Sequence, residues 1–315
     1  MKAIQIKDYG DASSLVVAEL PTPAPAAGQV RIDVRAASVN PFDVKVRNGW
    51  LRGFFPLPMP YTLGTDFAGV VSARGDGVTT LAVGDRVFGM LTPMHGGTYA
   101  EQIVIDERLA RRAPAGLSDV DAAALPLVGV TALIAVAELA RVERGQRVLV
   151  HGAGGGVGGA AVMLAKDRGA TVIATCGTDK CELVRSLGAD VVIDYTSGDF
   201  CASAGIVDVV IDTVGGDTNL RSYQALRRGG TMVVVLRNDQ QEMSNRERLS
   251  QQHEVAVKEV AYDLRPDLLD TVRELAERGV LKANVQTVLP LAQAAEAHRL
   301  IESGHTRGKI VLKIG

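Results

Sequence analysis

A cluster of glycines near the middle of the chain has the residue types and the spacing for a clear piece of chemistry. The apolar run 147–150 leads into residues 151–159, HGAGGGVGG, and a helix-forming segment begins at Ala160. Glycines after a strand let the backbone approach a pyrophosphate closely, and the amide groups of the following helix attract its negative charge. The spacing Ala153-x-Gly155-x-x-Gly158 fills the dinucleotide-binding fingerprint with alanine at its first position. The sequence therefore predicts a nucleotide-binding turn.

The residues expected to contact the nucleotide lie in this turn and in the loops after the neighbouring strands. In a doubly wound parallel sheet these loops share the carboxyl edge, where ligands bind. The turn contributes Ala153, Gly154, Gly155, Gly156, Val157 and Gly158, and the ends of the later strands with the loops that follow them contribute Thr175, Thr178, Lys180, Val214 and Leu236.

The segment after the second strand of this sheet favours NADPH over NADH. An NAD site usually carries an acidic residue about 20 residues beyond the glycines, whereas an NADP site needs positive charge there. Residues 175–180, TCGTDK, end the strand with small neutral side chains. Thr178 can donate to a phosphate oxygen, and Lys180 can supply a point charge. Two alternatives stay open: Asp179, turned inward, would accept the ribose hydroxyls of NADH, and Lys180 can be a solvated surface residue.

The order of strand and helix patterns predicts two domains of different class. Up to about residue 117, short valine and isoleucine runs broken by Gly and Pro predict an irregular, mostly β domain. Beyond it, strands alternate with helices, which predicts an α/β fold with a doubly wound parallel sheet. The expected elements are a helical stretch 119–140, strands 147–151, 171–176, 191–194, 207–212 and 231–236, helices 157–168 and 180–187, a sixth strand 255–262, a helix 266–278 and a last strand 309–314. We assign residues 118–262 to the sheet domain, and residues 1–117 with 263–315 to the mostly β domain.

Composition and charge exclude several classes of function. The 315 residues are 47% hydrophobic and 22% charged, with 34 Lys and Arg against 36 Asp and Glu. This near balance leaves no basic field for nucleic acid or anionic lipid, and no apolar run reaches membrane-spanning length. The opening MKAIQI lacks the apolar core of a signal peptide, and three cysteines without Cys-x-x-Cys spacing fit a reducing compartment. We expect a cytoplasmic protein without nucleic-acid or membrane partners.

Five motifs precede the glycine turn, and a sixth follows near the end of the chain. They are Asn40-Pro41-x-Asp43, Gly64-Thr65-Asp66-x-Ala68-Gly69-Val70-Val71, Val83-Gly84-Asp85-Arg86-Val87, Gly97-Thr98-Tyr99-Ala100-Glu101, Pro126-x-x-Gly129-x-Thr131-Ala132 and Gly304-His305-x-x-Gly308-Lys309-Ile310-Val311-Leu312. Together they resemble the medium-chain dehydrogenase/reductase superfamily, specifically its zinc-free quinone oxidoreductase branch, with alkenal and enone reductases as near relatives. The resemblance covers essentially the whole chain. It implies a GroES-like catalytic domain together with a Rossmann NADP-binding domain.

The sequence departs from the zinc-dependent members of that superfamily. Where they carry a cysteine and a Gly-His-Glu motif, this chain has Pro41 and Gly64-Thr65-Asp66, and their lobe of four closely spaced cysteines is missing. The histidines lack a second ligand at metal spacing, so we expect no metal. Without a metal to polarise an oxygen, hydride transfer suits an acceptor that is already electrophilic, such as a quinone or an α,β-unsaturated carbonyl.

The resemblance implies a catalytic cleft between the two domains, with Asn40, Asp43 and Thr131 near the nicotinamide and its ribose. Asn40 offers both a donor and an acceptor, and Thr131 offers a hydroxyl. The alternative for Asp43 is a capping residue in a turn. Lys45 stands where many bacterial quinone reductases have tyrosine and where alkenal and enone reductases often have lysine. It can stabilise an oxyanion on the acceptor, or it can point to solvent.

Three aromatic residues complete the expected site. Trp50 and Phe54 can form an apolar wall for the substrate, or they can pack only on their own domain. The resemblance also implies that Tyr195 neighbours the adenosine phosphate of the cofactor.

The sequence thus predicts an NADPH-dependent oxidoreductase that transfers a hydride to a quinone or an α,β-unsaturated carbonyl. Two alternatives stay open. One is an enoyl-thioester reductase, to which Arg47 and Arg52 would supply positive charge, and the other is a non-catalytic NADPH-binding regulatory protein. The sixth strand, at the edge of the sheet, would pair with its twin across a two-fold axis in a homodimer.

Overall fold

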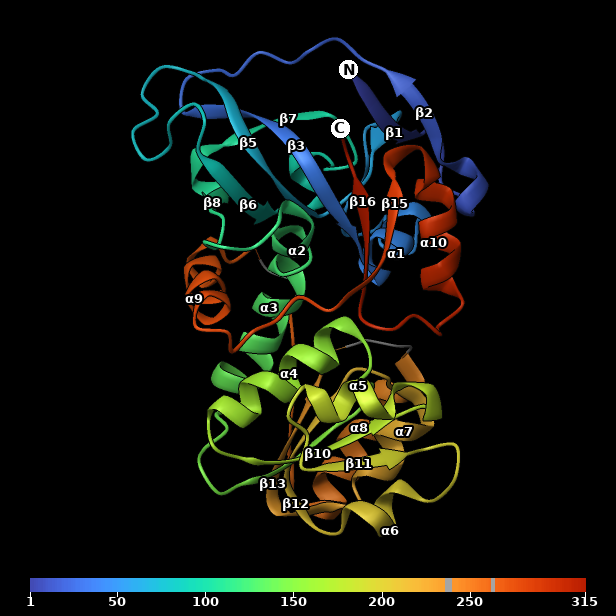
Figure 1. Ribbon diagram of the computed structural model, residues 1–315. Helices are drawn as coiled ribbons and strands as arrows, with labels where there is room; N and C mark the ends of the chain where they lie inside the picture. Colours follow the sequence, from blue (N-terminus) through green and yellow to red (C-terminus); the bar gives the residue numbers. More distant parts are fainter. Residues whose placement is uncertain (236–239, 262–263) are drawn as a thin grey trace. The chain divides into compact units, whose positions relative to one another are not determined.

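The computed structural model describes residues 1–235, 240–261 and 264–315, without the side chains of residues 240–243. The chain forms two compact units (Figure 1). Unit 1 consists of Met1–Leu127 and Leu264–Gly315, and unit 2 consists of Val128–Asp263. The first division thus falls after Leu127, where the sequence analysis set it after residue 117.

Within the described residues, unit 2 is built on a six-stranded sheet in which every neighbouring pair of strands is parallel. The strands are β9 (Arg147–Val150), β10 (Thr171–Cys176), β11 (Val191–Asp194), β12 (Val207–Asp212), β13 (Leu226–Val234) and β14 (Ala256–Glu259). Their order is β11-β10-β9-β12-β13-β14. The chain therefore builds outward from β9 in both directions, which is the doubly wound Rossmann arrangement. The predicted fold class of this part is confirmed.

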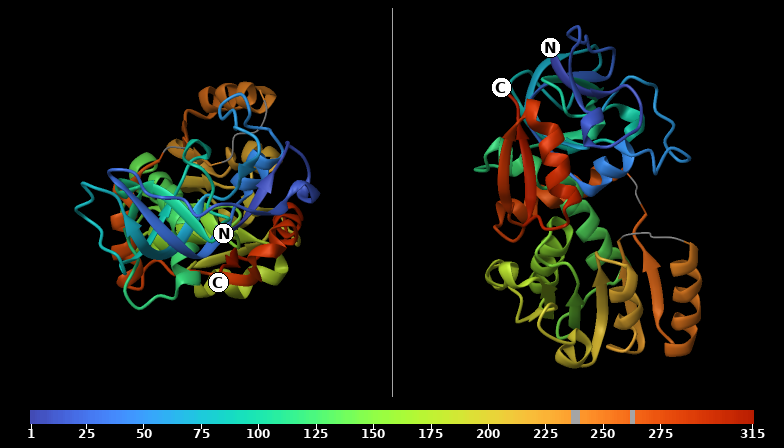
Figure 2. Two further views of the ribbon diagram at one scale, coloured as in Figure 1. Left: turned by 90° about the horizontal axis from the view of Figure 1, so that it is seen from above. Right: turned by 90° about the vertical axis from the view of Figure 1, so that its right-hand side faces the viewer.

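Helices connect these strands and cover the sheet. They are α3 (Pro126–Leu133), the π-helical segment Ile134–Leu139, α4 (Gly156–Asp167), α5 (Cys181–Ser186), α6 (Phe200–Ala204), α7 (Gly216–Ser222) and α8 (Gln240–His253). The first two residues of α3 still belong to unit 1. Helix α4 packs on β9 and β10, and its residues from Gly158 to Ala165 are buried. Helix α8 packs beside the edge strand β14 (Figure 2).

Most predicted elements agree with the observed ones to within a few residues, and two predicted elements differ in a way that has a physical reason. The helical stretch expected over 119–140 is divided into α2 (Asp119–Ala123), α3 and the π-helical segment. The reason is Pro126, because proline lacks an amide hydrogen and disfavours the helical conformation of the preceding residue. The strand expected from residue 231 begins at Leu226, because a register shift between β12 and β13 lets them pair over a longer stretch.

Some predictions reach beyond the described residues. The sixth strand expected over 255–262 is observed as Ala256–Glu259, and Tyr262 lies outside the described residues. Leu236, expected to contact the nucleotide, also lies outside them.

Unit 1 is mostly β, as predicted. One sheet has the order β15-β16-β3-β5-β6-β8, with β7 also paired to β3, and a smaller one has the order β2-β1-β4. The strands are β1 (Lys2–Ile6), β2 (Val16–Glu19), β3 (Gln29–Val39), β4 (Tyr61–Thr62), β5 (Asp66–Arg74), β6 (Arg86–Met90), β7 (Gln102–Asp106), β8 (Ala110–Arg112), β15 (Val285–Pro290) and β16 (Lys309–Lys313). Besides α2, this unit contains the α-helices α1 (Pro41–Arg47), α9 (Pro266–Glu277) and α10 (Ala294–Glu302).

The last strand, β16, joins the C-terminal segment of unit 1 to its N-terminal segment. β16 pairs antiparallel with β3, and Ile310 lies opposite Val39. The core beneath these strands is apolar and includes the fully buried side chains of Ile32, Phe67 and Leu312. The register therefore brings the beginning of β16 next to the end of β3, where α1 starts.

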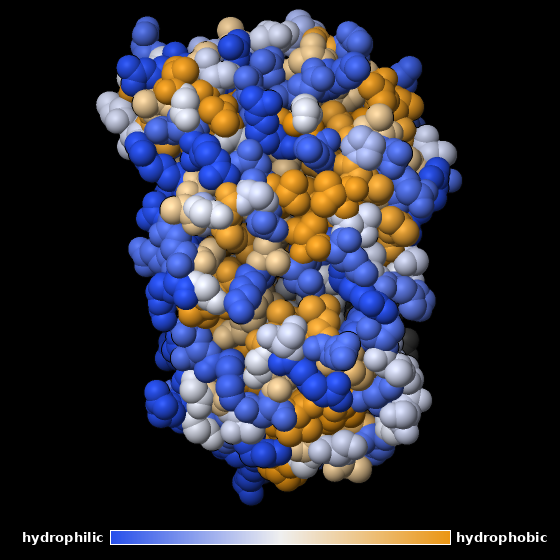
Figure 3. Space-filling view, in the orientation of Figure 1, coloured by the Kyte–Doolittle hydropathy of each residue, from blue (hydrophilic) through white to orange (hydrophobic). Residues whose placement is uncertain are grey.

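The surface mixes hydrophilic residues with apolar ones. Hydrophilic side chains cover most of the face drawn in Figure 3, and apolar ones gather in separate patches. Among the described residues, no helix is both long enough and apolar enough to cross a membrane.

We predict that Gly158→Ala destabilises unit 2. A Cβ at this position would lie 2.3 Å from the Gly152 carbonyl oxygen, so the turn must move away from α4. We expect a loss of about 1–3 kcal/mol in the free energy of unfolding, measured by urea denaturation. Gly198→Ala in the same unit is the control, because no atom lies within 4 Å of its new Cβ. Equal stability of the two variants would contradict this packing.

Candidate functional site

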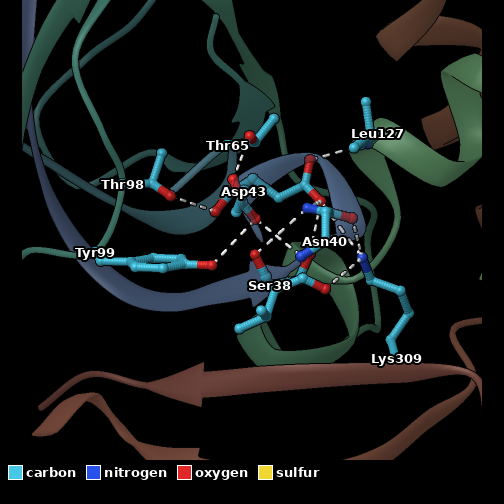
Figure 4. Close-up of polar contacts among 10 residues, drawn as sticks. Ser38, Asn40, Asp43, Thr65, Thr98, Tyr99, Leu127 and Lys309 are labelled. Carbon is cyan, nitrogen blue, oxygen red and sulfur yellow. Dashed lines mark hydrogen bonds and ion pairs between the residues drawn. The ribbon is translucent and has the colours of Figure 1, made fainter. Parts of the chain in front are cut away.

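The first candidate region is a cluster of buried polar side chains in unit 1, shown in Figure 4. We call it the buried polar cluster. Ser38 lies on strand β3, which ends at Val39. Asn40 follows this strand and precedes helix α1, which carries Asp43. The other members come from β5 and its approach, from the segment before β7 and from the start of β16; they are Thr65, Asp66, Tyr99 and Lys309. All of these side chains are buried.

Asn40 is held by its neighbours on both sides of its amide. Its Nδ2 donates to Asp66 Oδ2 at 3.0 Å, and its Oδ1 accepts from Lys309 Nζ at 2.5 Å. The residue is only 1% exposed. The donor and the acceptor that the sequence suggested for a ligand are therefore both used inside unit 1.

Asp43 caps the helix on which it lies. Its Oδ2 accepts from the backbone amide of Asn40 at 2.8 Å and from the Tyr99 hydroxyl at 3.1 Å. Its Oδ1 accepts from Thr65 Oγ1 at 2.6 Å. Burial raises the pKa of Asp43 to about 6, although the hydrogen bonds from Thr65 and Asn40 act in the opposite direction. The capping role that the sequence left open is thus present, and a role beside a nucleotide stays a prediction.

Asp66 and Lys309 form the charged centre of the cluster. Asp66 Oδ2 lies 3.7 Å from Lys309 Nζ and accepts from Ser38 Oγ at 2.6 Å. Its Oδ1 accepts from the amide of Leu127, near the start of α3, at 2.9 Å. Burial raises the pKa of Asp66 and lowers that of Lys309, and each charge opposes the shift of the other. Each ion therefore makes burial of its partner tolerable.

Asp66 and Lys309 were not predicted as site residues from the sequence. Both lie in the motifs Gly64-Thr65-Asp66 and Gly308-Lys309. The available signal was an acidic residue and a basic residue next to apolar strand patterns. Charged side chains are seldom buried without a partner, so two such residues could have been predicted to pair.

The other predicted residues of unit 1 lie on and after α1. Lys45 is half-buried, and burial lowers the pKa of its ammonium group. Trp50 and Phe54 are 69% and 78% exposed, so they are not packed into the core of their own unit. Thr131 lies on α3 and belongs to unit 2, and its residue is partly buried.

The second candidate region is the glycine turn of unit 2, between β9 and α4. Gly155 is the N-cap of α4, and no described side chain caps this helix end. The amides of Gly156, Val157 and Gly158 are therefore available to an anion. The turn itself is held by backbone bonds, from the Ala153 amide to the Thr175 carbonyl at 3.1 Å and from the Gly155 amide to the Gly152 carbonyl at 2.9 Å.

The loop after β10 lies directly on this turn. A Cβ at Gly154 would lie 2.5 Å from Lys180 Cδ, so the stem of Lys180 covers the glycine. The loop after β12 is also close, because a Cβ at Gly152 would lie 3.2 Å from a methyl group of Val214. Val214 is 47% exposed. The structure thus brings Gly154 and Lys180 together, as well as the turn and Val214.

Thr175, near the end of β10, and Thr178, in the loop after it, both have partners within unit 2. The Thr175 hydroxyl lies 2.9 Å from His151 Nδ1, and burial lowers the pKa of this histidine to about 4, so that its ring is neutral. Thr178 donates to Asp194 Oδ2 at 2.6 Å. Tyr195 is 60% exposed, and its hydroxyl would lie 3.7 Å from a Cβ at Gly177. Tyr195 therefore borders the same loop as Lys180.

Within the described residues, no group of three or more His, Cys, Asp or Glu side chains is arranged to hold a metal ion.

Two family models match the chain. The model described as alcohol dehydrogenase GroES-like domain matches residues 26–115, and the model described as zinc-binding dehydrogenase matches residues 187–312. The first confirms the GroES-like class expected for the mostly β part.

Similar proteins match nearly the whole chain. A chloroplast envelope quinone oxidoreductase homolog of Arabidopsis thaliana is 31% identical over 99% of this chain and 98% of its own. The crystal structure of Escherichia coli quinone oxidoreductase complexed with NADPH has a TM-score of 0.87 and 29% identity, and covers 99% of this chain and 100% of that one. A mycocerosic acid synthase-like polyketide synthase of Mycobacterium tuberculosis is 37% identical over 99% of this chain, which spans only 15% of that synthase.

We predict that Lys309→Met destabilises unit 1 by about 3–5 kcal/mol, because it leaves the buried Asp66 carboxylate without its counter-charge. The measurement is urea denaturation, with Lys313→Met, on the exposed end of the same strand, as the control. Adding Asp66→Asn removes the unpaired charge, so the double variant should lose less stability than the two single losses combined. Additive losses would show that the pair is not coupled.

Proposed function

The chain belongs to the medium-chain dehydrogenase/reductase superfamily of oxidoreductases, and from this membership we propose that it transfers a hydride, without a metal ion, from NADPH to a quinone or an α,β-unsaturated carbonyl. The observation that carries the proposal is the glycine turn, with its uncapped helix and Lys180 over Gly154. The full-length match to a quinone oxidoreductase homolog supports the choice of acceptor.

The residues of the turn fit a dinucleotide. Side chains at Gly154 and Gly158 would collide with Lys180 and with the Gly152 backbone, so the turn keeps its close path against α4 only with glycine at these positions. The free amides at the start of α4 hold the pyrophosphate, and Val214 borders the turn from the loop after β12. The bound nucleotide supplies the reactive hydride.

Lys180 favours the phosphorylated nucleotide, and Tyr195 borders the same loop. Strand β10 ends in Cys176 and is followed by Gly177, so the last strand residues carry no carboxylate of the kind an NAD site usually has there. Asp179 is the rival, because its Oδ1 would lie 3.3 Å from a Cβ at Gly177, where it can accept the ribose hydroxyls of NADH. Lys180 lies over the turn, and its ammonium group supplies a charge for the 2′-phosphate. Thr178 is a weaker donor for that phosphate than the sequence suggested, because its hydroxyl donates to Asp194.

On the acceptor side, Lys45 is the group that stabilises negative charge. Its partial burial strengthens its electrostatic effect on an oxyanion that develops on the acceptor. Asn40 and Asp43 act as positioning residues, because their polar groups hold the start of α1 and so fix the helix that carries Lys45. Trp50 and Phe54 offer exposed aromatic surface for a ring or an alkyl chain.

The metal-free mechanism rests on residue types. Pro41 and Gly64-Thr65-Asp66 stand where the zinc-dependent enzymes carry cysteine and Gly-His-Glu, and Asp66 is engaged by Ser38 and Asn40. An acceptor that is already electrophilic needs alignment and oxyanion stabilisation rather than a Lewis acid. We also assign a homodimer to this function, formed through the edge strand β14.

An enoyl-thioester reductase is the second candidate, and the polyketide synthase match favours it. Of the two arginines suggested for such a substrate, Arg47 is fully buried and paired with Glu302. It therefore cannot contact a carrier substrate, and only the exposed Arg52 keeps that role.

We predict NADPH oxidation, followed by absorbance, with 1,4-benzoquinone and with a short alkenal. An enoyl thioester is tested in parallel at the same concentrations. Faster turnover of the thioester would favour the second candidate, and tight NADPH binding without turnover of any acceptor would favour a non-catalytic regulatory protein. Addition of a chelator should leave the rate unchanged, and loss of the rate would contradict the metal-free mechanism.

We predict that Lys180→Ala weakens NADPH binding by about ten- to a hundredfold, the value of a hydrogen bond to a charged group. NADH affinity should stay nearly constant, because NADH lacks the 2′-phosphate. Titration of both nucleotides checks this. The control is Lys166→Ala, which removes a lysine of the same unit that pairs with Asp190. A parallel loss for NADPH and NADH would assign Lys180 to the turn rather than to the phosphate.

A further inference from the structure

Two cysteines enclose the loop that carries Lys180. Cys176 is the last residue of β10, and Cys181 is the first residue of α5. Their sulfur atoms are 3.6 Å apart, and Cys176 Sγ donates to Cys181 Sγ. Both are free thiols. Between them lies only the segment 177–180, which forms a short 3-10 turn.

We propose that Cys176 and Cys181 form a reversible disulfide when the protein meets a peroxide, and that this bond weakens NADPH binding by moving the loop 177–180. The effect on NADPH rests on the proposed function, whereas the pairing of the two thiols does not. The site is thus a redox-sensitive modification site beside the cofactor loop.

The geometry favours a bond between these two sulfurs. A disulfide is about 2.05 Å long, so the sulfur atoms must approach by about 1.5 Å, which side-chain rotation together with a shift of the segment 177–180 between them can provide. Cys201, on α6, has different surroundings, because its thiol donates to the Arg221 carbonyl at 3.4 Å. Cys201 is therefore an internal control with the same chemistry and no thiol partner among the described residues.

Accessibility sets the order of the two chemical steps. Cys181 is partly exposed and Cys176 is buried, so the peroxide oxidises Cys181 first, to a sulfenic acid, and is itself reduced to water. The Cys176 sulfur then attacks the Cys181 sulfur, the S–S bond forms, and the hydroxyl group leaves as a second water with the Cys176 proton. Two electrons pass from the two thiols to one peroxide. Burial raises the pKa of Cys176 to about 12, so this second step is the slow one.

The bond acts on the loop through its shortened span. Lys180 directly precedes Cys181, and its stem lies on Gly154. Thr178, in the same segment, is tied to Asp194, which limits how the loop can adjust. Drawing the ends of the segment together therefore displaces the Lys180 side chain from the turn, and the 2′-phosphate loses its cationic partner.

The pairing is tested by treating the full chain with hydrogen peroxide and digesting it with trypsin under non-reducing conditions. Because trypsin cuts after Lys180, the peptides that hold Cys176 and Cys181 stay joined only through a disulfide. We expect the joined pair in the wild type and in Cys201→Ser, its absence in Cys181→Ser and in Cys176→Ala, and its loss after dithiothreitol. Sulfinic acid at Cys181 without a joined pair, or a disulfide that involves Cys201, would overturn the proposal.

The effect on binding is tested by titrating NADPH into the oxidised and the reduced protein. We expect about tenfold weaker binding after oxidation, reversed by dithiothreitol and absent in Cys181→Ser, and a smaller change for NADH. Unchanged NADPH affinity in a protein with the mapped disulfide would overturn the regulatory part. If reduced protein fails to bind NADPH, the proposed function fails, and with it the regulatory part, while the peptide map still decides whether the thiols pair.

Discussion

The buried charge on Asp66 is the constraint on which the arrangement of unit 1 depends. A carboxylate with no exposed surface is stable only if donors and a counter-charge surround it. These partners come from three distant parts of the chain: Ser38 and Asn40 at the end of β3, the Leu127 amide near the start of α3, and Lys309 at the start of β16. The pairing of β16 with β3 therefore has an electrostatic reason as well as a hydrophobic one.

The same constraint fixes helix α1. Asn40 links the charged pair to the helix, because its side chain binds Asp66 and Lys309 while its backbone amide donates to Asp43. Asp43 in turn is bound by Thr65 and Tyr99. With its first turn held in this way, α1 carries Lys45 on a rigid support, which is what the oxyanion stabilisation proposed for this lysine would require. Asn40 and Asp43, predicted from the sequence to lie near the nicotinamide, thus also support the helix that carries Lys45.

The parts predicted well from the sequence are those whose signal is local. The glycine turn and the strands around it lie within short segments whose apolar and glycine patterns specify them. The role of Asn40 was not accessible in this way, because its partner Lys309 is 269 residues away, and only the register of β16 with β3 brings them together. The break before Pro126 had a local signal that the helical pattern on either side obscured. Thr178 was assigned to a phosphate because nothing in its own segment reveals Asp194, which comes from the next strand.

The separation of tasks within unit 2 explains where cofactor choice and its control belong. The turn contacts a ligand through backbone amides, which serve the pyrophosphate common to NADH and NADPH and do not distinguish the two. Discrimination therefore has to come from side chains beyond β10. Lys180 connects the two tasks, because its stem lies on Gly154 while its charge lies at the end of a flexible chain. On the proposed function, a change in the path of residues 177–180 would therefore alter selectivity without disturbing the turn, and the disulfide proposed between Cys176 and Cys181 would act on these residues from both ends.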